Sequence, residues 1–185
     1  RAPPSRLPFM AKEFERLEIC VARSAKRGWP VTTARHWARK YPDLFTLKDL
    51  HHTRTQPDYH FPEWALAVHL RRRHGFWSLL KYSFRGDSWK AERVTRLLGR
   101  RRAAWLVSSV TRHHAQPPDL LVFDPRAWKP VFFAEAKGEG DSMRRNQRIF
   151  FALLQERLRI PVRIYRVRGG LGEVIKYGII SDPSL

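Results

Sequence analysis

The sequence predicts an α/β fold, with a mixed sheet from residues 103–180, flanking helices at 88–98 and 142–159, and a helical N-terminal region. Short apolar runs alternate with helical patterns along this half of the chain, which is typical of sheets covered by helices. The chain has 185 residues and 43% of them are hydrophobic. That is enough for one well-formed core, or for a core and a small helical partner.

The first third of the chain is expected to be helical. A proline-rich, extended lead-in at residues 1–8 precedes a helical apolar pattern at residues 9–27, which places Cys20 on a buried helix face. A second short helix is expected at residues 32–40. Short helices with basic side chains could form a DNA-binding element or a lid packed on the core.

The polar stretch at residues 51–62 contains two prolines and three histidines and is the expected internal boundary. Residues 1–60 would then form the N-terminal helical region, and residues 61–185 the main domain. Histidines here without a cysteine partner or helical spacing are poor evidence for zinc.

Four elements are expected in the middle of the chain. Residues 63–73 have a helical apolar pattern that Gly75 closes. An apolar segment at residues 76–84 predicts a strand, and Ser88 can cap a helix that runs to Leu98. Residues 103–110 are expected to form the next strand.

The net charge of +19, with a pI near 11.2, indicates a polyanionic partner, of which nucleic acid is the first choice. Residues 61–112 carry twelve lysines and arginines against three acids, so the DNA-facing surface is expected there. Arginine runs are often simply solvated, but in a chain this basic they are candidates for phosphate contact. The candidates are Arg71, Arg72, Arg73, Arg100, Arg101, Arg102, Arg144, Arg145 and Arg148.

A single cysteine excludes an internal disulfide framework and suits a reducing compartment. No apolar run has membrane-spanning length and no signal peptide is visible. We therefore expect no membrane partner and an intracellular location, in the cytoplasm, nucleoid or nucleus.

The stretch at residues 118–147 carries the chemistry. Period-two alternation places Glu135 and Lys137 on one face of a strand that is otherwise apolar. Asp119 shares a face with the apolar residues of the preceding strand, so pairing of the two strands would bring it beside Glu135. Two close carboxylates resist ionising unless a cation lies between them. Mg²⁺ or Mn²⁺, which prefer oxygen ligands, are the natural candidates.

These residues resemble the signature of the PD-(D/E)XK nucleases: Pro118-Asp119, then Glu135-Ala136-Lys137 sixteen residues after the aspartate. An acidic, glycine-containing turn that ends at Asp141, and Gln147 ten residues past the lysine, resemble the VRR nuclease (VRR-NUC) branch. The likeness covers roughly residues 88–168. It departs from the family at Ala136, where valine is more common, and at the extra acid Glu139 in the turn.

The resemblance implies a restriction-endonuclease-like core and a DNA endonuclease that uses Mg²⁺ or Mn²⁺. Asp119, Glu135 and the carbonyl of Ala136 would hold the metal, and Lys137 would position the attacking water. Gln147 would belong to the active-site set. The resemblance also implies a further acid on a helix before the sheet. Glu92 takes this place in the sequence order, and Glu63 is the alternative.

Helix 142–159 would place Gln147 at the head of its buried face, before final strands at 162–167 and 174–180. Branched, flap or junction DNA is the substrate class that VRR-like enzymes suggest, with a homodimer possible on junctions. Two other classes stay open: a DNA-binding module without catalysis, and a basic RNA-binding protein.

Overall fold

A computed structural model describes residues 14–58, 60–82, 88–112, 116–170 and 175–176 of the chain. A six-stranded mixed sheet runs through its middle in the order β2-β3-β4-β5-β1-β6. The strands are β1 (Glu15–Ala22), β2 (Trp77–Leu80), β3 (Leu120–Asp124), β4 (Lys129–Lys137), β5 (Val162–Gly170) and β6 (Ile175–Lys176). The helices are α1 (Arg23–Arg27), α2 (Thr32–Lys40), α3 (Leu47–Thr55), α4 (Phe61–His74), α5 (Ser88–Leu98), α6 (Arg100–Arg112) and α7 (Arg145–Leu158).

The sheet combines an antiparallel meander with parallel strands. β2, β3 and β4 pair antiparallel, whereas β5 runs parallel to β4 and β1 runs parallel to β5. The connection between the parallel strands β4 and β5 contains helix α7, because parallel neighbours need a long crossover connection. Strands β3 and β4 therefore lie in the interior of the sheet, with a neighbouring strand on each side.

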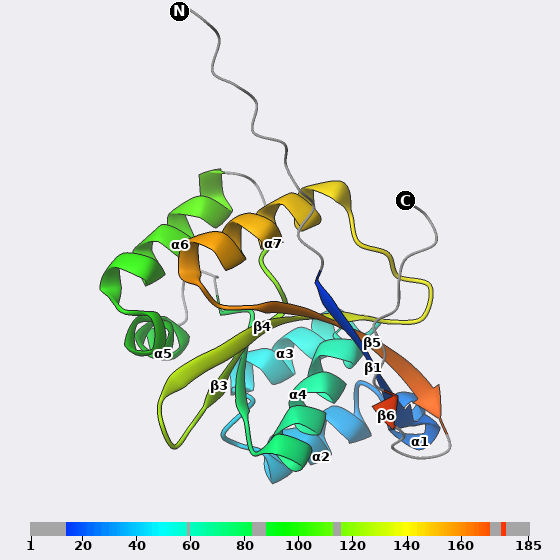
Figure 1. The fold of residues 1–185 in the computed structure, drawn as a ribbon. Helices are drawn as coiled ribbons and strands as arrows, with labels where there is room; N and C mark the ends of the chain where they lie inside the picture. The colour runs from blue at the N-terminus through cyan, green and yellow to red at the C-terminus, as the bar shows by residue number, and fades with distance from the viewer. Residues whose placement is uncertain (1–13, 59, 83–87, 113–115, 171–174, 177–185) are drawn as a thin grey trace, which may run out of the picture.

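Helices cover both faces of the sheet, giving three layers (Figure 1). Helices α2, α3 and α4 pack on one face, and α5, α6 and α7 on the other. Successive residues of β3 divide between the two cores: Leu120 and Val122 belong to the first, Leu121 and Phe123 to the second. Because both faces of the central strands are buried, a charged side chain there needs a partner.

The helix expected at residues 9–27 is wrong for most of its described part, and only its last residues, Arg23–Arg27, are helical, as α1. Residues Glu15–Ala22 form strand β1, which pairs with β5 along its whole length. The β-branched Ile19 and Val21 suit a pleated strand, and the exposed edge of β5 supplies its hydrogen-bond partners, so tertiary pairing overrides the helical pattern. Cys20 therefore lies on a strand, half-buried and with a free thiol.

The strand expected at residues 103–110 is also wrong, because this segment lies inside helix α6. Its buried residues are Ala103, Leu106 and Ser109, spaced three apart along one helix face. The apolar run was too short to separate a strand from a helix by its period alone.

Other elements agree more closely with the sequence. Helices α2, α4, α5 and α7 lie where patterns placed them, and Gly75 ends α4 with a positive φ of 70°.

The boundary expected at residue 60 does not divide the structure. Part of residues 51–62 is helix α3, β1 is a strand of the main sheet, and α2 and α3 pack into the same core as α4. The proline-rich lead-in at residues 1–8 lies outside the described residues.

Near the C-terminus, β5 continues through Gly169 and Gly170, where a turn was expected. Strand β6 falls within the expected strand at 174–180, most of which lies outside the described residues. Among the described residues, no helix is both long and apolar enough to cross a membrane.

If β1 belongs to the cooperative core, Ile19→Ala should lower the free energy of unfolding by about 2–5 kcal/mol, because the side chain is 1% exposed in the first core. The same substitution at Ile149, 45% exposed on α7, should change it by less than about 0.5 kcal/mol. Urea unfolding measures both values. If both substitutions changed the free energy of unfolding by the same small amount, β1 would not belong to the cooperative core.

Candidate active site

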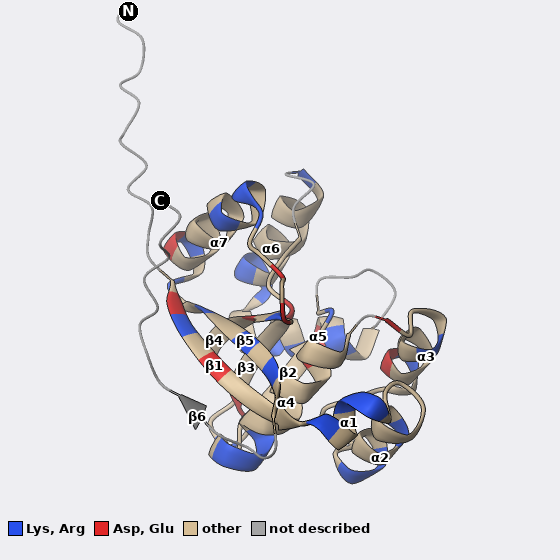
Figure 2. Ribbon diagram, turned by 90° about the vertical axis from the view of Figure 1, so that its right-hand side faces the viewer, with Lys and Arg blue, Asp and Glu red and all other residues tan. Residues whose placement is uncertain are grey.

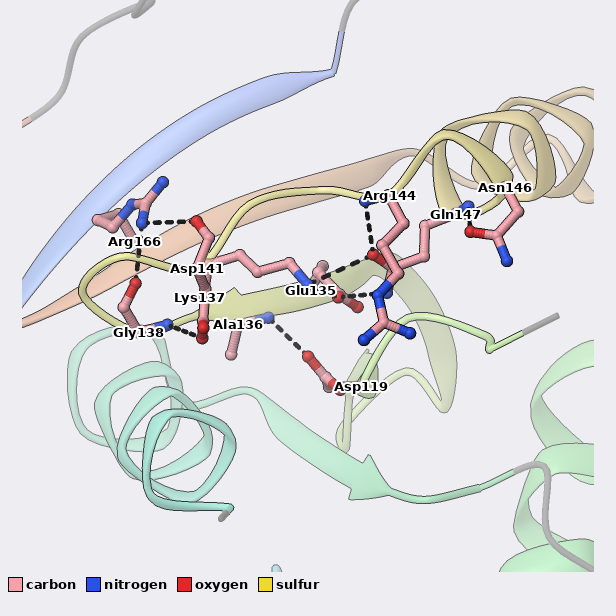
Figure 3. Close-up of polar contacts among 10 residues, drawn as sticks. All are labelled: Asp119, Glu135, Ala136, Lys137, Gly138, Asp141, Arg144, Asn146, Gln147 and Arg166. Atoms are coloured by element: carbon pink, nitrogen blue, oxygen red, sulfur yellow. Dashed lines mark hydrogen bonds and ion pairs between the residues drawn. The ribbon is translucent and has the colours of Figure 1, made fainter. Parts of the chain in front are cut away.

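Asp119 and Glu135 meet at one end of the meander. Leu120 pairs with Ala134 across β3 and β4, so Asp119, one residue before β3, lies level with the end of β4. The Ala136 N–H donates to Asp119 Oδ2 at 2.8 Å (Figure 3). The strand pairing expected from the sequence therefore forms, and it brings the two carboxylates to the same place.

Glu135 is buried, with 2% of its surface exposed. Its Oε1 is 2.7 Å from Lys137 Nζ and accepts a hydrogen bond from Gln147 Nε2 at 3.1 Å. Its Oε2 is buried and has no hydrogen-bond partner in the described part of the chain. A buried carboxylate oxygen without a partner is costly, so Glu135 has an unfilled requirement for a cation or a donor.

Gln147 connects the start of α7 to this carboxylate. It is 6% exposed, and its Oε1 accepts the Arg144 N–H at 3.1 Å and faces Lys137 Nζ at 3.5 Å. One side chain thus caps the helix, orients Lys137 and holds Glu135. The position expected for Gln147, at the head of the buried face of α7, is the observed one.

The turn after β4 is fixed from a neighbouring strand. Asp141 accepts the Gly138 N–H at 2.9 Å, and Arg166 on β5 donates to the carbonyls of both residues at 2.8 Å (Figure 3). The acidic turn therefore has a structural role, and it holds the chain between Lys137 and α7 in place.

A cavity of about 620 Å³ opens at this end of the sheet, between α3, the start of α4 and the turn before α7. Asp119, Glu135, Lys137 and Gln147 line one side of it. His52, His60, Glu63 and Lys81 line another side. The sequence reasoning missed His52, His60 and Lys81 as site residues. The only signals were the histidine-rich stretch at residues 51–62 and a lysine within the apolar segment at residues 76–84.

Of the two candidate helical acids, the structure brings only Glu63 to the cavity. Glu63 lies in the first turn of α4, the helix that precedes β2, and lines the cavity beside Asp119. Glu92 is exposed on α5 and does not line it. The structure therefore places Glu92 away from the carboxylate pair, and its role at the site stays a prediction. The order of the helices could be predicted, but not that α5 and α6 are inserted between β2 and β3.

Most of the candidate phosphate-binding arginines lie away from the cavity. Arg71 binds Asp43 at 2.8 Å, and Arg72 and Arg73 follow it at the far end of α4, about 12 Å of helix beyond Glu63. Arg100, Arg101 and Arg102 are exposed in the first turn of α6. Arg144 lines the cavity, Arg145 is exposed beside it, and Arg148 is half-buried one turn later. Figure 2 shows that lysine and arginine are spread over helices on both sides of the sheet.

The electrostatics of the carboxylate pair favour a bound cation. Burial, together with the charges of Glu135 and Glu63, raises the pKa of Asp119 well above its ordinary value, against the effect of the Ala136 N–H and Lys137. Burial also raises the pKa of Glu135, although Lys137 opposes this. Both shifts show that the ionised forms lack sufficient compensation inside the protein.

The donor set fits a hard divalent ion. Asp119 supplies carboxylate oxygen, Glu135 Oε2 has no other partner, and such ions often use one or two carboxylates and take water for the rest. Within the described ranges, no group of three or more histidine, cysteine, aspartate or glutamate side chains is arranged to hold a metal. A metal here would therefore depend on these two carboxylates, with Glu63 further out.

Comparison of the chain with protein-family models, with curated proteins and with solved structures finds no match. What the fold and the cavity define is an α/β protein with a mixed sheet between two layers of helices. Its carboxylate pair, the half-buried Asp119 and the buried Glu135, lies in a cavity at one end of the central strands.

Replacing Asp119 with asparagine should stabilise the metal-free protein above about pH 4, the ordinary pKa of an aspartate. Because the folded-state pKa is raised, the folded protein loses stability as the pH rises through that pKa, and the neutral amide avoids this loss. The amide oxygen can still accept the Ala136 N–H. Each kcal/mol recovered corresponds to roughly 2–4 °C in Tm.

Thermal melts in EDTA between pH 4 and 8 test this, with Asp124→Asn at the opposite end of β3 as the matched control. The Tm of Asp119→Asn should exceed that of wild type by an amount that increases as the pH rises, whereas the Tm of the control should equal that of wild type at each pH. A lower Tm for Asp119→Asn at pH 8 would contradict the assignment.

Proposed function

We propose that this chain is a Mg²⁺- or Mn²⁺-dependent DNA endonuclease that hydrolyses phosphodiester bonds. The observation that carries the proposal is the convergence of Asp119, Glu135, Lys137 and Gln147 in one cavity. These are the residues of the nuclease-like motif, drawn from two strands and a helix. The net charge of +19 supplies the affinity for a polyanion that such an enzyme needs.

Each side chain has a role that follows from its contacts. Asp119, Glu135 and the Ala136 carbonyl would hold the metal, whose chemistry is to acidify a water and to stabilise charge on the phosphate. Lys137 is held by Glu135 and Gln147, so its ammonium group is positioned before substrate arrives. A preorganised cation can orient a water and offset charge that develops on the phosphate. Glu63 completes the acidic side of the cavity in place of Glu92.

Branched, flap or junction DNA is the substrate class we propose, in repair, recombination or processing of mobile DNA, with a homodimer as a possible working form. This part of the proposal rests on the likeness to VRR nucleases.

A DNA-binding module without catalysis is the second candidate. One observation favours it: the described residues hold no cluster of three or more side chains arranged for a metal, and Lys137 already neutralises part of Glu135. Such a module would bind DNA through its basic surface and cut nothing, whatever the metal. A basic RNA-binding protein would share the charge but would have no use for the carboxylate pair.

Lys137→Ala should reduce cleavage by about 10²–10⁴-fold while leaving DNA binding nearly unchanged, because one positioned cation is lost from the cavity and most of the basic surface remains. The assay incubates the protein with labelled linear, flap and four-way-junction DNA in Mg²⁺, Mn²⁺ or EDTA. Lys129→Ala, at the exposed start of the same strand, is the matched control and should cut normally. Cutting by Lys137→Ala at the wild-type rate, or in EDTA, would sink the proposal.

Glu63→Gln should slow cleavage by about 10–100-fold, as expected for a group that supports a metal site from outside the direct ligands. Glu92→Gln should leave the rate unchanged because its side chain is exposed away from the cavity. Rates for the two variants, measured side by side, decide which glutamate belongs to the site. The reverse order would restore Glu92 as the helical acid.

A further inference from the structure

The cavity has a second wall that the nuclease-like motif does not use, formed by His52, His60 and Lys81. His52 lies on α3, His60 precedes α4, and Lys81 follows the last residue of β2. All three line the same cavity as Asp119 and Glu135. Three nitrogen-bearing side chains therefore line the same cavity as the site proposed to react.

Lys81 is fixed relative to the carboxylates by its backbone. Its N–H donates to the Asp119 carbonyl at 3.4 Å, extending the β2–β3 pairing by one residue. Its φ of 48° is uncommon for a lysine, so the chain leaves the strand abruptly here. The side chain is half-buried and its Nζ lies 3.1 Å from His60 Nε2.

Lys81 makes no ion pair with a carboxylate of the described residues. Asp49 is bound by Lys90, with 2.6 Å between Oδ1 and Nζ and each side chain only 4% exposed. Glu63 contacts the ring of His60, with 3.4 Å between Oε1 and Nδ1. An ammonium group has three donors, and the contact with His60 uses one at most. Lys81 itself lines the cavity, where a ligand could accept its remaining donors.

Two histidine rings lie beside this ammonium group, and both ring nitrogens of His60 already have polar contacts. His60 is held between Gln56, at 2.8 Å from Nε2, and Glu63, which fixes its ring close to Lys81. His52 Nδ1 is buried and has no hydrogen-bond partner in the part of the chain that the structure describes. A ligand with several acceptor oxygens could bind Lys81 and reach these rings, whereas a single carbonyl could not.

We propose that His52, His60 and Lys81 form a binding site for a backbone phosphate of the nucleic acid strand. The inference rests on the proposed function in that the phosphate belongs to the strand that enters the cavity. Lysine is a common phosphate ligand that acts as a point charge, and phosphate contacts position a strand without reading its sequence. Because Lys81 is tied to Asp119, a phosphate held here would set where the strand lies over the carboxylate pair.

The test measures DNA binding in EDTA, where no cleavage is required. The probe is a fluorescein-labelled single-stranded oligonucleotide titrated by anisotropy at several salt concentrations. Lys81→Met should weaken binding and reduce the salt slope by about 0.7, the contribution of one phosphate contact on a single strand. Lys81→Arg should keep the slope, and Lys129→Met, at the exposed start of β4, should match wild type.

A second readout follows the histidine rings by NMR with ¹⁵N-histidine protein. The His52 and His60 signals, assigned with His52→Gln and His60→Gln, should shift when the oligonucleotide is added to wild type and should shift much less in Lys81→Met. Thermal melts check that each variant is folded.

An unchanged salt slope in Lys81→Met, or an equal loss in Lys129→Met, would overturn the phosphate site. The phosphate site would also be overturned if the His52 and His60 signals did not shift when the oligonucleotide is added. A failure of the proposed function looks different, because the chain would then cut no DNA with any metal while these binding results stayed as they are.

Discussion

The burial of Glu135 beside Asp119 is the constraint on which the rest of the site depends. A strand covered on both faces has no water to solvate a carboxylate, so every oxygen needs a partner from the protein or from a ligand. Lys137 and Gln147 satisfy Glu135 Oε1, and the Ala136 N–H satisfies one oxygen of Asp119. Glu135 Oε2 remains unsatisfied. Proteins tolerate such a defect chiefly where it serves a function.

Several elements of the fold position this pair of carboxylates and their partners. The register of β3 against β4 sets the two carboxylates level, and the turn held by Arg166 delivers α7 so that Gln147 reaches back to Glu135. Helix α4 brings Glu63 to the same cavity from the opposite layer. The site thus draws on both helical layers and on the sheet between them, which explains how residues so far apart in the chain meet in one cavity.

The carboxylate pair and Gln147 could be predicted because their signals are local: period two in β4, a helical stripe in α7 and a short connection between them. Strand β1 could not, since its partner β5 is distant in sequence and only that pairing makes it a strand. Glu63 was ranked below Glu92 because α6 was taken for a strand, which made α5 the helix before the sheet. Lys81 gave almost no signal, because its role comes from a backbone bond to Asp119.

In the proposed enzyme, affinity for nucleic acid and chemistry would be separable, because most of the candidate phosphate-binding arginines lie away from the cavity. Arg71, Arg72 and Arg73 lie at the far end of α4, and Arg100, Arg101 and Arg102 lie on α6. Their field attracts a polyanion from any direction and is screened by salt. Lys81 and Lys137 line the cavity in partly buried surroundings, where charges interact more strongly at short range. Arg144 also lines the cavity but is exposed. The distant arginines would therefore govern how fast and how tightly a nucleic acid binds, and the three cations at the cavity would govern where its backbone comes to rest.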